Sequence, residues 1–275
     1  MQKKIAVIND LSGYGRCSLT VAIPVLSAMG HQCCPIPTAI LSNHTEFPVY
    51  FFDDYTEKIT TYTDKWKELG LSFDAIATGF LGSEAQIGIV MEIVQKLKAE
   101  KTFVVVDPVM GDHGHAYETY TPEMCEQMKE LVCMADVVLP NVTECCILTD
   151  TPYREENWTR KELLNMAMML RLMGAKSVVI TGVREGSCYT NVVLEQGQYD
   201  AKFIRTRSSG GERPGTGDVF SSVVAGALLN GKSLPEAVSQ AAGFVKECIK
   251  VSDEEQIPHA NGVCFEKILG KLIKK

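Results

Sequence analysis

A glycine-rich turn stands directly before an apolar run near residue 220. Gly215, Thr216 and Gly217 precede Asp218, and the mostly apolar residues that follow predict a buried helix. The first turn of a helix carries unpaired backbone N–H groups and the positive end of the helix dipole, and glycine lets a ligand approach the backbone closely. The turn is therefore a candidate anion site.

Asp218 adds a carboxylate to this anion site. It can accept a proton from a substrate hydroxyl while the N–H groups hold the negative charge that moves to the electrophile. This pairing suits phosphoryl transfer, in which positioning and charge stabilisation do most of the work. In the alternative interpretation the segment is an ordinary turn and Asp218 only caps the helix, since short glycine motifs also occur by chance.

Three further carboxylates follow apolar runs and are candidates to hold a magnesium–nucleotide. Asp107 and Glu144 each lie just after a predicted strand, and Asp112 lies in the loop after Asp107. Carboxylates beside phosphates usually act through Mg²⁺, often with water between them. Asn141 is a candidate to orient Glu144. For Asp107 and Asn141 the alternative is a cap of a proline-containing turn, and for Asn141 alone that alternative is favoured.

Other polar or aromatic residues at predicted strand ends have two interpretations each. Thr181 ends a strand and offers a hydroxyl or backbone group to a phosphate, or simply begins a turn. His44 lies in a polar and aromatic loop with the character of a lid, although a lone loop histidine is usually solvated. Phe80 and Tyr14 are candidates to stack on a flat ring, or belong to the core.

The elements that must position these residues alternate between strand and helix, which predicts parallel strands with helices on both faces. A hairpin over residues 187–206, turning near Gln196 and Gly197, adds a mixed edge. With no linker in the sequence, we expect one domain over residues 1–275. Ligands bind at the carboxyl ends of such strands. The predicted strands are 3–8, 73–79, 102–107, 135–140 and 176–181, and the predicted helices are about 17–29, 56–69, 84–99, 122–133, 159–173, 217–230, 234–250 and 263–273.

The composition and the missing motifs argue against several classes of function. The net charge of −7 argues against a nucleic-acid partner. No run of about 18 apolar residues predicts a membrane span, and no signal peptide is evident, so we expect a cytoplasmic protein. The ten cysteines contain no C-x-x-C pair, which favours packed, reduced thiols over a zinc site. Neither a dinucleotide fingerprint nor a Walker-A pattern is present.

Five motifs together resemble one family. The segments PGTGDVF, DPVMGD, PNVTE, TGFLGS and TAILSNHTEF are similar to those of the ribokinase-like superfamily, and specifically of its pyridoxal (pyridoxine, pyridoxamine) kinases. The resemblance covers residues from about 4 to 250. It implies a three-layer sandwich and ATP-dependent phosphorylation of the 5′-hydroxymethyl group of a vitamin B6 vitamer. It also implies a homodimer with loops that close over the substrates.

The resemblance assigns roles to residues of this chain. Asp218 is the implied base, and the turn of Gly215, Thr216 and Gly217 is the implied anion hole. The implied vitamer-binding residues are Asp10, Ser12, Thr38, Ala39, Ser42, His44, Phe80 and Asp218. The implied ATP-binding residues are Asp107, Asp112, Asn141, Glu144, Thr181, Gly211, Arg213, Pro214 and Gly217, of which Asp107, Asp112 and Glu144 serve Mg²⁺.

Three positions depart from the family pattern and leave the substrate open. Asp10 stands where many pyridoxal kinases carry a serine, Phe80 where a tyrosine is common, and Leu139 replaces a small or hydroxylated residue. The stretch around Asp10 also resembles hydroxymethylpyrimidine kinases, which are the first alternative. A non-catalytic module that binds nucleotide or vitamer is the second. A requirement for a monovalent cation also stays open.

Overall fold

The computed structural model describes residues 2–273. One sheet has the strand order β11-β10-β9-β8-β5-β4-β1-β2-β3, and a two-stranded ribbon, β6 with β7, lies apart from it. The strands are β1 (Lys4–Tyr14), β2 (Gln32–Asn43), β3 (Phe52–Asp54), β4 (Ala75–Thr78), β5 (Phe103–Val106), β6 (Gly111–Asp112), β7 (His115–Ala116), β8 (Val137–Val138), β9 (Ser177–Glu185), β10 (Cys188–Leu194) and β11 (Lys202–Arg207).

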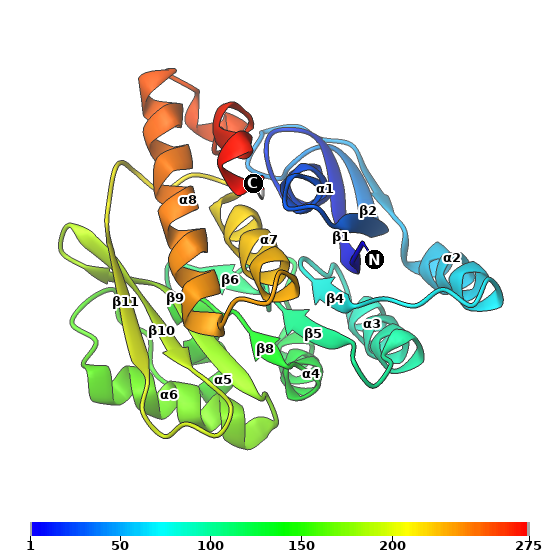
Figure 1. Ribbon diagram of the computed structural model, residues 1–275, viewed down its shortest axis with the longest axis horizontal. Helices are drawn as coiled ribbons and strands as arrows, with labels where there is room; N and C mark the ends of the chain where they lie inside the picture. The colour runs from blue at the N-terminus through cyan, green and yellow to red at the C-terminus, as the bar shows by residue number, and fades with distance from the viewer. Residues whose placement is uncertain (1, 274–275) are drawn as a thin grey trace.

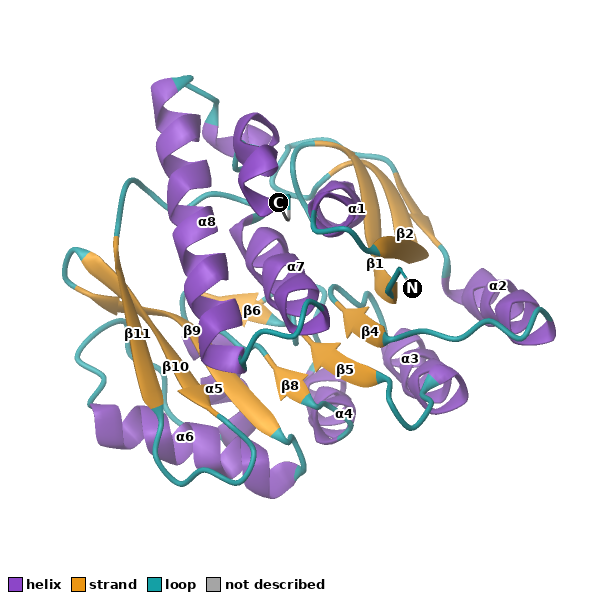
Figure 2. Ribbon diagram, viewed as in Figure 1, coloured by secondary structure: helices purple, strands orange, loops and turns teal. Residues whose placement is uncertain are grey.

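Helices cover both faces of this sheet (Figures 1 and 2). Helices α2 to α6 pack on one face and α1, α7 and α8 on the other. The α-helices are α1 (Ser18–Ala28), α2 (Thr56–Glu68), α3 (Glu84–Leu97), α4 (Pro122–Cys133), α5 (Val142–Thr149), α6 (Arg160–Met173), α7 (Thr216–Leu229) and α8 (Leu234–Glu254), and the 3-10 helices are η1 (His259–Asn261) and η2 (Glu266–Leu272). Across residues 2–273, none of the helices combines the length and the apolar character that crossing a bilayer requires.

The central strands are apolar on both faces because both are covered. In β1, Val7 packs toward α1 and α7, whereas Ile8 packs toward the opposite helices, and Val105 and Val106 alternate in the same way in β5. Strands β2, β1, β4, β5, β8 and β9 run parallel, and β3, β10 and β11 add antiparallel edges. The predicted three-layer α/β fold with a mixed edge is confirmed.

The largest error of the sequence prediction is β2, which was not predicted as a strand. Its two prolines, Pro35 and Pro37, argue against a central strand because proline cannot donate to a ladder. In the structure β3 pairs only with Ala39–Leu41 of β2. The segment of β2 that holds Pro35 and Pro37 therefore has β1 as its one neighbouring strand. The Pro35 carbonyl accepts a hydrogen bond from the Tyr62 hydroxyl of α2 instead. The proline residues therefore lie where the sheet has a local edge.

Three other boundaries differ from the prediction. β1 continues to Tyr14, beyond the predicted end at residue 8, because β2 supplies a partner along its whole length. The short helix α5 was not predicted, since only eight residues separate its cap from its end. The predicted C-terminal helix at 263–273 is the 3-10 helix η2 at Glu266–Leu272. These differences affect the site, because α5 and the end of β1 both carry candidate residues.

Candidate active site

α7 begins at the predicted glycine turn. Gly215 has a φ of 78°, in the left-handed region, and a Cβ there would lie 1.8 Å from the backbone oxygen of Arg16, so only glycine fits. A Cβ on Gly217 would meet nothing within 4 Å, which shows that this part of the first turn faces open space. Gly215 gives α7 no side-chain cap. The first-turn N–H groups are thus left without a side-chain cap beside open space, and their role as an anion site stays a prediction.

Asp218 lies in this first turn. Asn9 donates from Nδ2 to Asp218 Oδ1 over 3.2 Å, and the backbone N–H of Ser18 donates to the same carboxylate. Burial raises the pKa of Asp218 to about 6; the charge of Asp10 also raises it, and the two hydrogen bonds oppose the shift. Such a carboxylate is mostly ionised at neutral pH and still basic enough to take a proton.

Asp10 lies inside β1, and not in a loop after it as predicted. The pairing of β1 with β2 shifts at this point, so that Thr38 and Ala39 both stand opposite Asp10. Such bulges are common beside active sites. Ser12 Oγ and Ser18 Oγ donate to different oxygens of the Asp10 carboxylate. The side chain is buried, which raises its pKa, while both serine hydroxyls lower it.

The remaining predicted vitamer residues gather at the ends of β2 and β4. Thr38 Oγ1 donates to the carbonyl of Phe80 over 3.1 Å. Ser42 is exposed, and its hydroxyl donates to Asn43 and accepts the N–H of Phe51. The structure thus brings β2 and the loop after β4 together beside Asp10.

His44 is buried, in contrast to an ordinary solvated loop histidine. Its Nε2 lies 2.7 Å from the carbonyl oxygen of Ala260, and its ring packs on Phe47. Gly15 leaves room for this ring, because a Cβ there would lie 2.4 Å from His44 Cδ2. The loop after β2 is therefore fastened to η1 through His44. Its contact with a vitamer stays a prediction.

Glu144 and Asn141 form a capping box at the start of α5. Asn141 Oδ1 accepts the N–H of Glu144, and Glu144 Oε2 accepts the N–H of Asn141. The other oxygen of Glu144 accepts the N–H of Met110 over 3.2 Å. The two interpretations of Asn141 are therefore compatible, since the cap itself orients Glu144. Burial raises the pKa of Glu144 well above its usual range, and the nearby charge of Asp107 raises it further.

Asp107 interacts electrostatically with both Glu144 and Asp218. Burial raises its pKa to about 8, the Asp218 charge raises it too, and the Ser221 hydroxyl opposes the shift. A cation between the half-buried Asp107 and the buried Glu144 would offset the cost of placing these two negative charges close together. Mg²⁺ fits this donor set, because it commonly binds one or two carboxylates and keeps several waters.

Asp112 does not join this pair. It lies exposed on the β6–β7 ribbon, where its Oδ1 accepts the N–H of His113. Over residues 2–273 no three His, Cys, Asp or Glu side chains are arranged to hold a metal ion. The structure thus brings together Asp107 and Glu144 and leaves the third predicted metal ligand at the rim, because the ribbon turns its side chain toward solvent.

Two of the predicted nucleotide residues are held by the fold itself. Thr181 forms an isolated parallel bridge with Asn141, so it extends the line between β8 and β9 at the same edge of the sheet. Arg213 is turned toward the end of α8, where its guanidinium donates to the Ile257 carbonyl and to Asp253 over 2.8 and 2.9 Å. Arg213 therefore anchors the loop before α7 to the end of α8, and its contact with a nucleotide stays a prediction.

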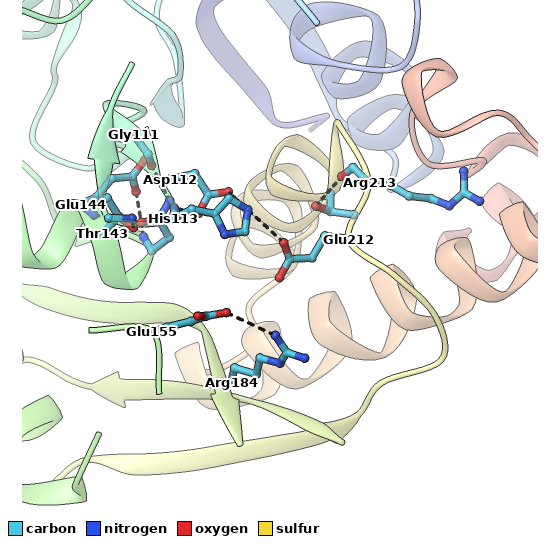
Figure 3. A network of polar contacts seen from close by, with 12 residues as sticks. Gly111, Asp112, His113, Thr143, Glu144, Glu155, Arg184, Glu212 and Arg213 are labelled. Carbon is cyan, nitrogen blue, oxygen red and sulfur yellow. Dashed lines mark hydrogen bonds and ion pairs between the residues drawn. The ribbon is translucent and has the colours of Figure 1, made fainter. Parts of the chain in front are cut away.

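The loop before α7 also contacts the ribbon. His113 Nε2 lies 3.3 Å from Glu212 Oε2, and Figure 3 shows the two side chains pointing toward each other from the β6–β7 ribbon and the loop. Gly211 and Pro214 flank this contact, and the Pro214 carbonyl accepts the N–H of Val263. The β6–β7 ribbon thus contacts the loop that was predicted to lie along the nucleotide.

Sequence reasoning missed three residues that shape the base. Asn9 and Ser18 donate to Asp218, and Gly79 lies against Asn9, where a Cβ would come within 2.4 Å of Asn9 Nδ2. A signal for Asn9 was present, because it is the first polar residue after the apolar run of β1 and shares the face of Val7. Ser18 and Gly79 carry no comparable signal, since their roles depend on contacts between distant segments.

The chain is similar to known kinases over most of its length. The model of the family "Phosphomethylpyrimidine kinase" matches residues 22–264. A Bacteroides thetaiotaomicron protein assigned as a phosphomethylpyrimidine kinase, and crystallised with pyridoxal, is 39% identical, with a TM-score of 0.94 over 99% of this chain and 96% of that one. The Bacillus subtilis pyridoxine kinase is 28% identical over 92% of this chain and 85% of its own.

A pyrimidine kinase is also among the relatives. The hydroxymethylpyrimidine/phosphomethylpyrimidine kinase of Aquifex aeolicus is 32% identical over 62% of this chain and 66% of its own. The family match covers the glycine turn, Asp218, Asp107 and Glu144, which are the residues that the fold brings to one edge of the sheet. The chain belongs to the phosphomethylpyrimidine kinase family, with the ribokinase-like fold of the pyridoxal kinases.

Proposed function

We propose that the chain transfers the γ-phosphoryl group of ATP to the 5′-hydroxymethyl oxygen of pyridoxal, pyridoxine or pyridoxamine. The observation that carries this proposal is the placement of Asp218 in the first turn of α7. Asp218 takes the hydroxyl proton as the oxygen–phosphorus bond forms and the bond to the β–γ bridging oxygen breaks. The N–H groups of Gly215, Thr216 and Gly217 stabilise the charge on the transferring group.

Asp107 and Glu144 hold Mg²⁺ on this proposal. A bound Mg²⁺ would supply positive charge that neutralises the negative charge developing on the nucleotide phosphates. Glu144 is held in place for this role, because each of its two oxygens accepts a backbone N–H group, from Met110 and from Asn141. Thr181 and the loop at Gly211–Pro214 border the nucleotide.

The vitamer lies beside Asp10, Thr38 and Phe80 on this proposal. The similarity to the protein crystallised with pyridoxal and to the pyridoxine kinase supports a pyridine substrate. Hydroxymethylpyrimidine is the second candidate, because Asp10 resembles the pyrimidine branch and an Aquifex aeolicus pyrimidine kinase is a relative. Both substrates carry a hydroxymethyl group on a flat ring, so both leave the role of Asp218 unchanged.

The test is a coupled assay of ADP release with ATP and Mg²⁺. Pyridoxal, pyridoxine, pyridoxamine and hydroxymethylpyrimidine are supplied in parallel, each with an acceptor-free control. We expect turnover with the pyridines and little with the pyrimidine. The reverse ranking would transfer the assignment to the pyrimidine branch. ADP release that needs no acceptor, or none at all, would overturn the proposal.

We also propose a homodimer that acts in the cytoplasm. The edge strand β3 and the residues before it expose Val49, Tyr50, Phe51 and Phe52, a continuous apolar surface that a second copy would cover. All ten cysteines are free thiols in the structure, which supports a reducing compartment. Light scattering after size exclusion tests the dimer, and a monomer at micromolar concentration would overturn it. Fractionation of cells tests the compartment.

A further inference from the structure

One side of the Asp218 carboxylate faces a small cavity. A cavity of about 20 Å³ lies between β1, α1 and α7, and its lining includes Asn9, Asp218, Ser221 and Ser222. This volume can hold one water molecule, so no side chain packs closely against the carboxylate on this side. Its orientation must therefore come from hydrogen bonds.

The amide of Asn9 is locked in one orientation. Its Oδ1 accepts the backbone N–H of Asp10 over 3.0 Å and that of Phe80 over 2.9 Å. Backbone N–H groups only donate, so the amide oxygen must face them and the NH₂ group must face the other way. On that side Nδ2 lies 3.2 Å from Asp218 Oδ1. The rotation of the amide thus fixes a donor against one oxygen of the base.

Gly79 leaves the space that the Asn9 side chain occupies. A Cβ on Gly79 would lie 2.4 Å from Asn9 Nδ2 and 2.5 Å from Cγ, closer than any side chain tolerates. The backbone of Gly79 is not in the left-handed region that favours glycine. The glycine is therefore required by the space that Asn9 needs, and not by the conformation of the loop after β4.

We propose that Asn9 is the positioning residue of the base. Its Nδ2 donates to Asp218 Oδ1 and so leaves the other carboxylate oxygen of Asp218 to face the substrate hydroxyl. Asn9 acts through Asp218 and does not itself touch the reacting atoms. The inference rests on the proposed function in one respect, namely that Asp218 is the base. It adds a residue that aligns the base across the gap between β1 and α7.

A double-mutant cycle on turnover tests this role. Asn9→Ala should lower kcat by roughly 10-fold to 10²-fold, the size expected for a small misplacement of a catalytic group, with KM for both substrates nearly unchanged. In the Asp218→Asn background the same substitution should have almost no further effect, because no base is left to position. An equal loss in both backgrounds, or a change confined to KM, would overturn the proposal.

Gly79→Ala disturbs Asn9 without removing it. We expect a loss of kcat similar to that of Asn9→Ala, and little further loss when the two are combined. Gly82→Ala is the matched control, because a Cβ there has only ordinary contacts at 3.7 Å or more. If Asn9→Ala does not fold, Gly79→Ala still tests the role of Asn9. Normal kcat in Gly79→Ala, with Asn9 displaced, would contradict the role of Asn9.

A crystal structure of Asn9→Ala gives a readout that does not need turnover. We expect Asp218 to leave its wild-type position or to adopt several conformers, while α7 and β1 keep theirs. An unmoved, single-conformer Asp218 would overturn the inference. Absence of turnover in the wild type, with Asp218 displaced in the variant, would instead count against the proposed function alone.

Discussion

The active site contains two acidic regions that are built differently. The base region comprises Asp10 and Asp218, whose carboxylates accept hydrogen bonds from Ser12, Ser18 and Asn9. The cation region comprises Asp107 and Glu144, and its donors are two backbone N–H groups on Glu144 and one serine hydroxyl on Asp107. The pKa is about 6 at Asp218 and about 8 at Asp107.

The difference shows which region is complete without a ligand. In the base region the chain supplies donors from β1 and α1, so Asp218 is ionised near neutral pH and ready to accept a proton. In the cation region desolvation raises the pKa of both carboxylates, the charge of Asp107 raises that of Glu144 further, and the hydrogen bonds that the fold supplies oppose these shifts only in part. On the proposed function, the base region is therefore preorganised, whereas the cation region would need an added cation to offset its negative charge.

The strongest test of this contrast is Asp218→Asn. We expect kcat to fall roughly 10²-fold to 10⁴-fold, the loss typical of a general base, while ADP binding is retained. The free energy of unfolding at pH 8 should increase, since the amide removes a buried charge beside Asp107. Turnover, calorimetry and thermal melting measure the three quantities.

Asp200→Asn is the control for that substitution, because Asp200 is exposed in the turn between β10 and β11. It should change neither turnover nor stability at pH 8. Near-normal kcat in Asp218→Asn would show that another group accepts the proton. A loss of stability would show that the base region needs the charge for folding.

Glu144→Gln should weaken the cation region next. Glutamine keeps an oxygen that can accept the Asn141 N–H but carries no charge, so we expect the Mg²⁺ concentration for half-maximal rate to rise roughly 10-fold to 10²-fold. Glu162→Gln is the matched control, because Glu162 forms the same capping box with Thr159 at the exposed start of α6. If both substitutions raised the required Mg²⁺ concentration equally, the effect would come from the weakened helix cap and not from the loss of a metal ligand.

The pH profile distinguishes the two regions without mutation. Asp218 must be ionised to accept a proton, so kcat should rise about tenfold per pH unit below a pKa of about 6 and level off above it. Because this pKa lies above the ordinary 3.8, the folded state binds more protons than the unfolded chain between those values. The contribution of Asp218 to stability is therefore full below about pH 4 and lost as pH rises through 6. An acid limb of kcat with its midpoint below pH 5 would contradict the assignment of Asp218 as the base.

The sequence predicted Asp218 but not all of the residues that contact it. The glycine turn and Asp218 are local, so helix-start signals find them, and the strand–helix alternation predicts the sheet. Asn9, Ser18 and Gly79 act across segments far apart in the chain, where no local pattern predicts a contact. β2 was missed because Pro35 and Pro37 indicate a break, while the short pairing with β3 leaves them an edge. Periodicity predicts elements but not the strand order that brings them together.

The smallest effects are expected at the two histidines that fasten the surrounding loops. His44 joins the loop after β2 to the Ala260 carbonyl on the side of Asp10, and His113 joins the β6–β7 ribbon to Glu212 on the side of Glu144. His44→Ala should raise the KM for the vitamer a few-fold and leave that for ATP unchanged. His113→Ala should do the reverse, and more weakly, because an exposed ion pair contributes less than about 1 kcal/mol.

Each histidine is the control for the other in this design, since both substitutions remove the same side chain from a loop. Steady-state kinetics with each substrate varied in turn gives the four KM values. If His44→Ala raised only the KM for the vitamer and His113→Ala only the KM for ATP, the base region and the cation region would be closed by separate loops. If either substitution raised both KM values equally, the two regions would close as one unit, because a ligand on one side would then order the loop on the other.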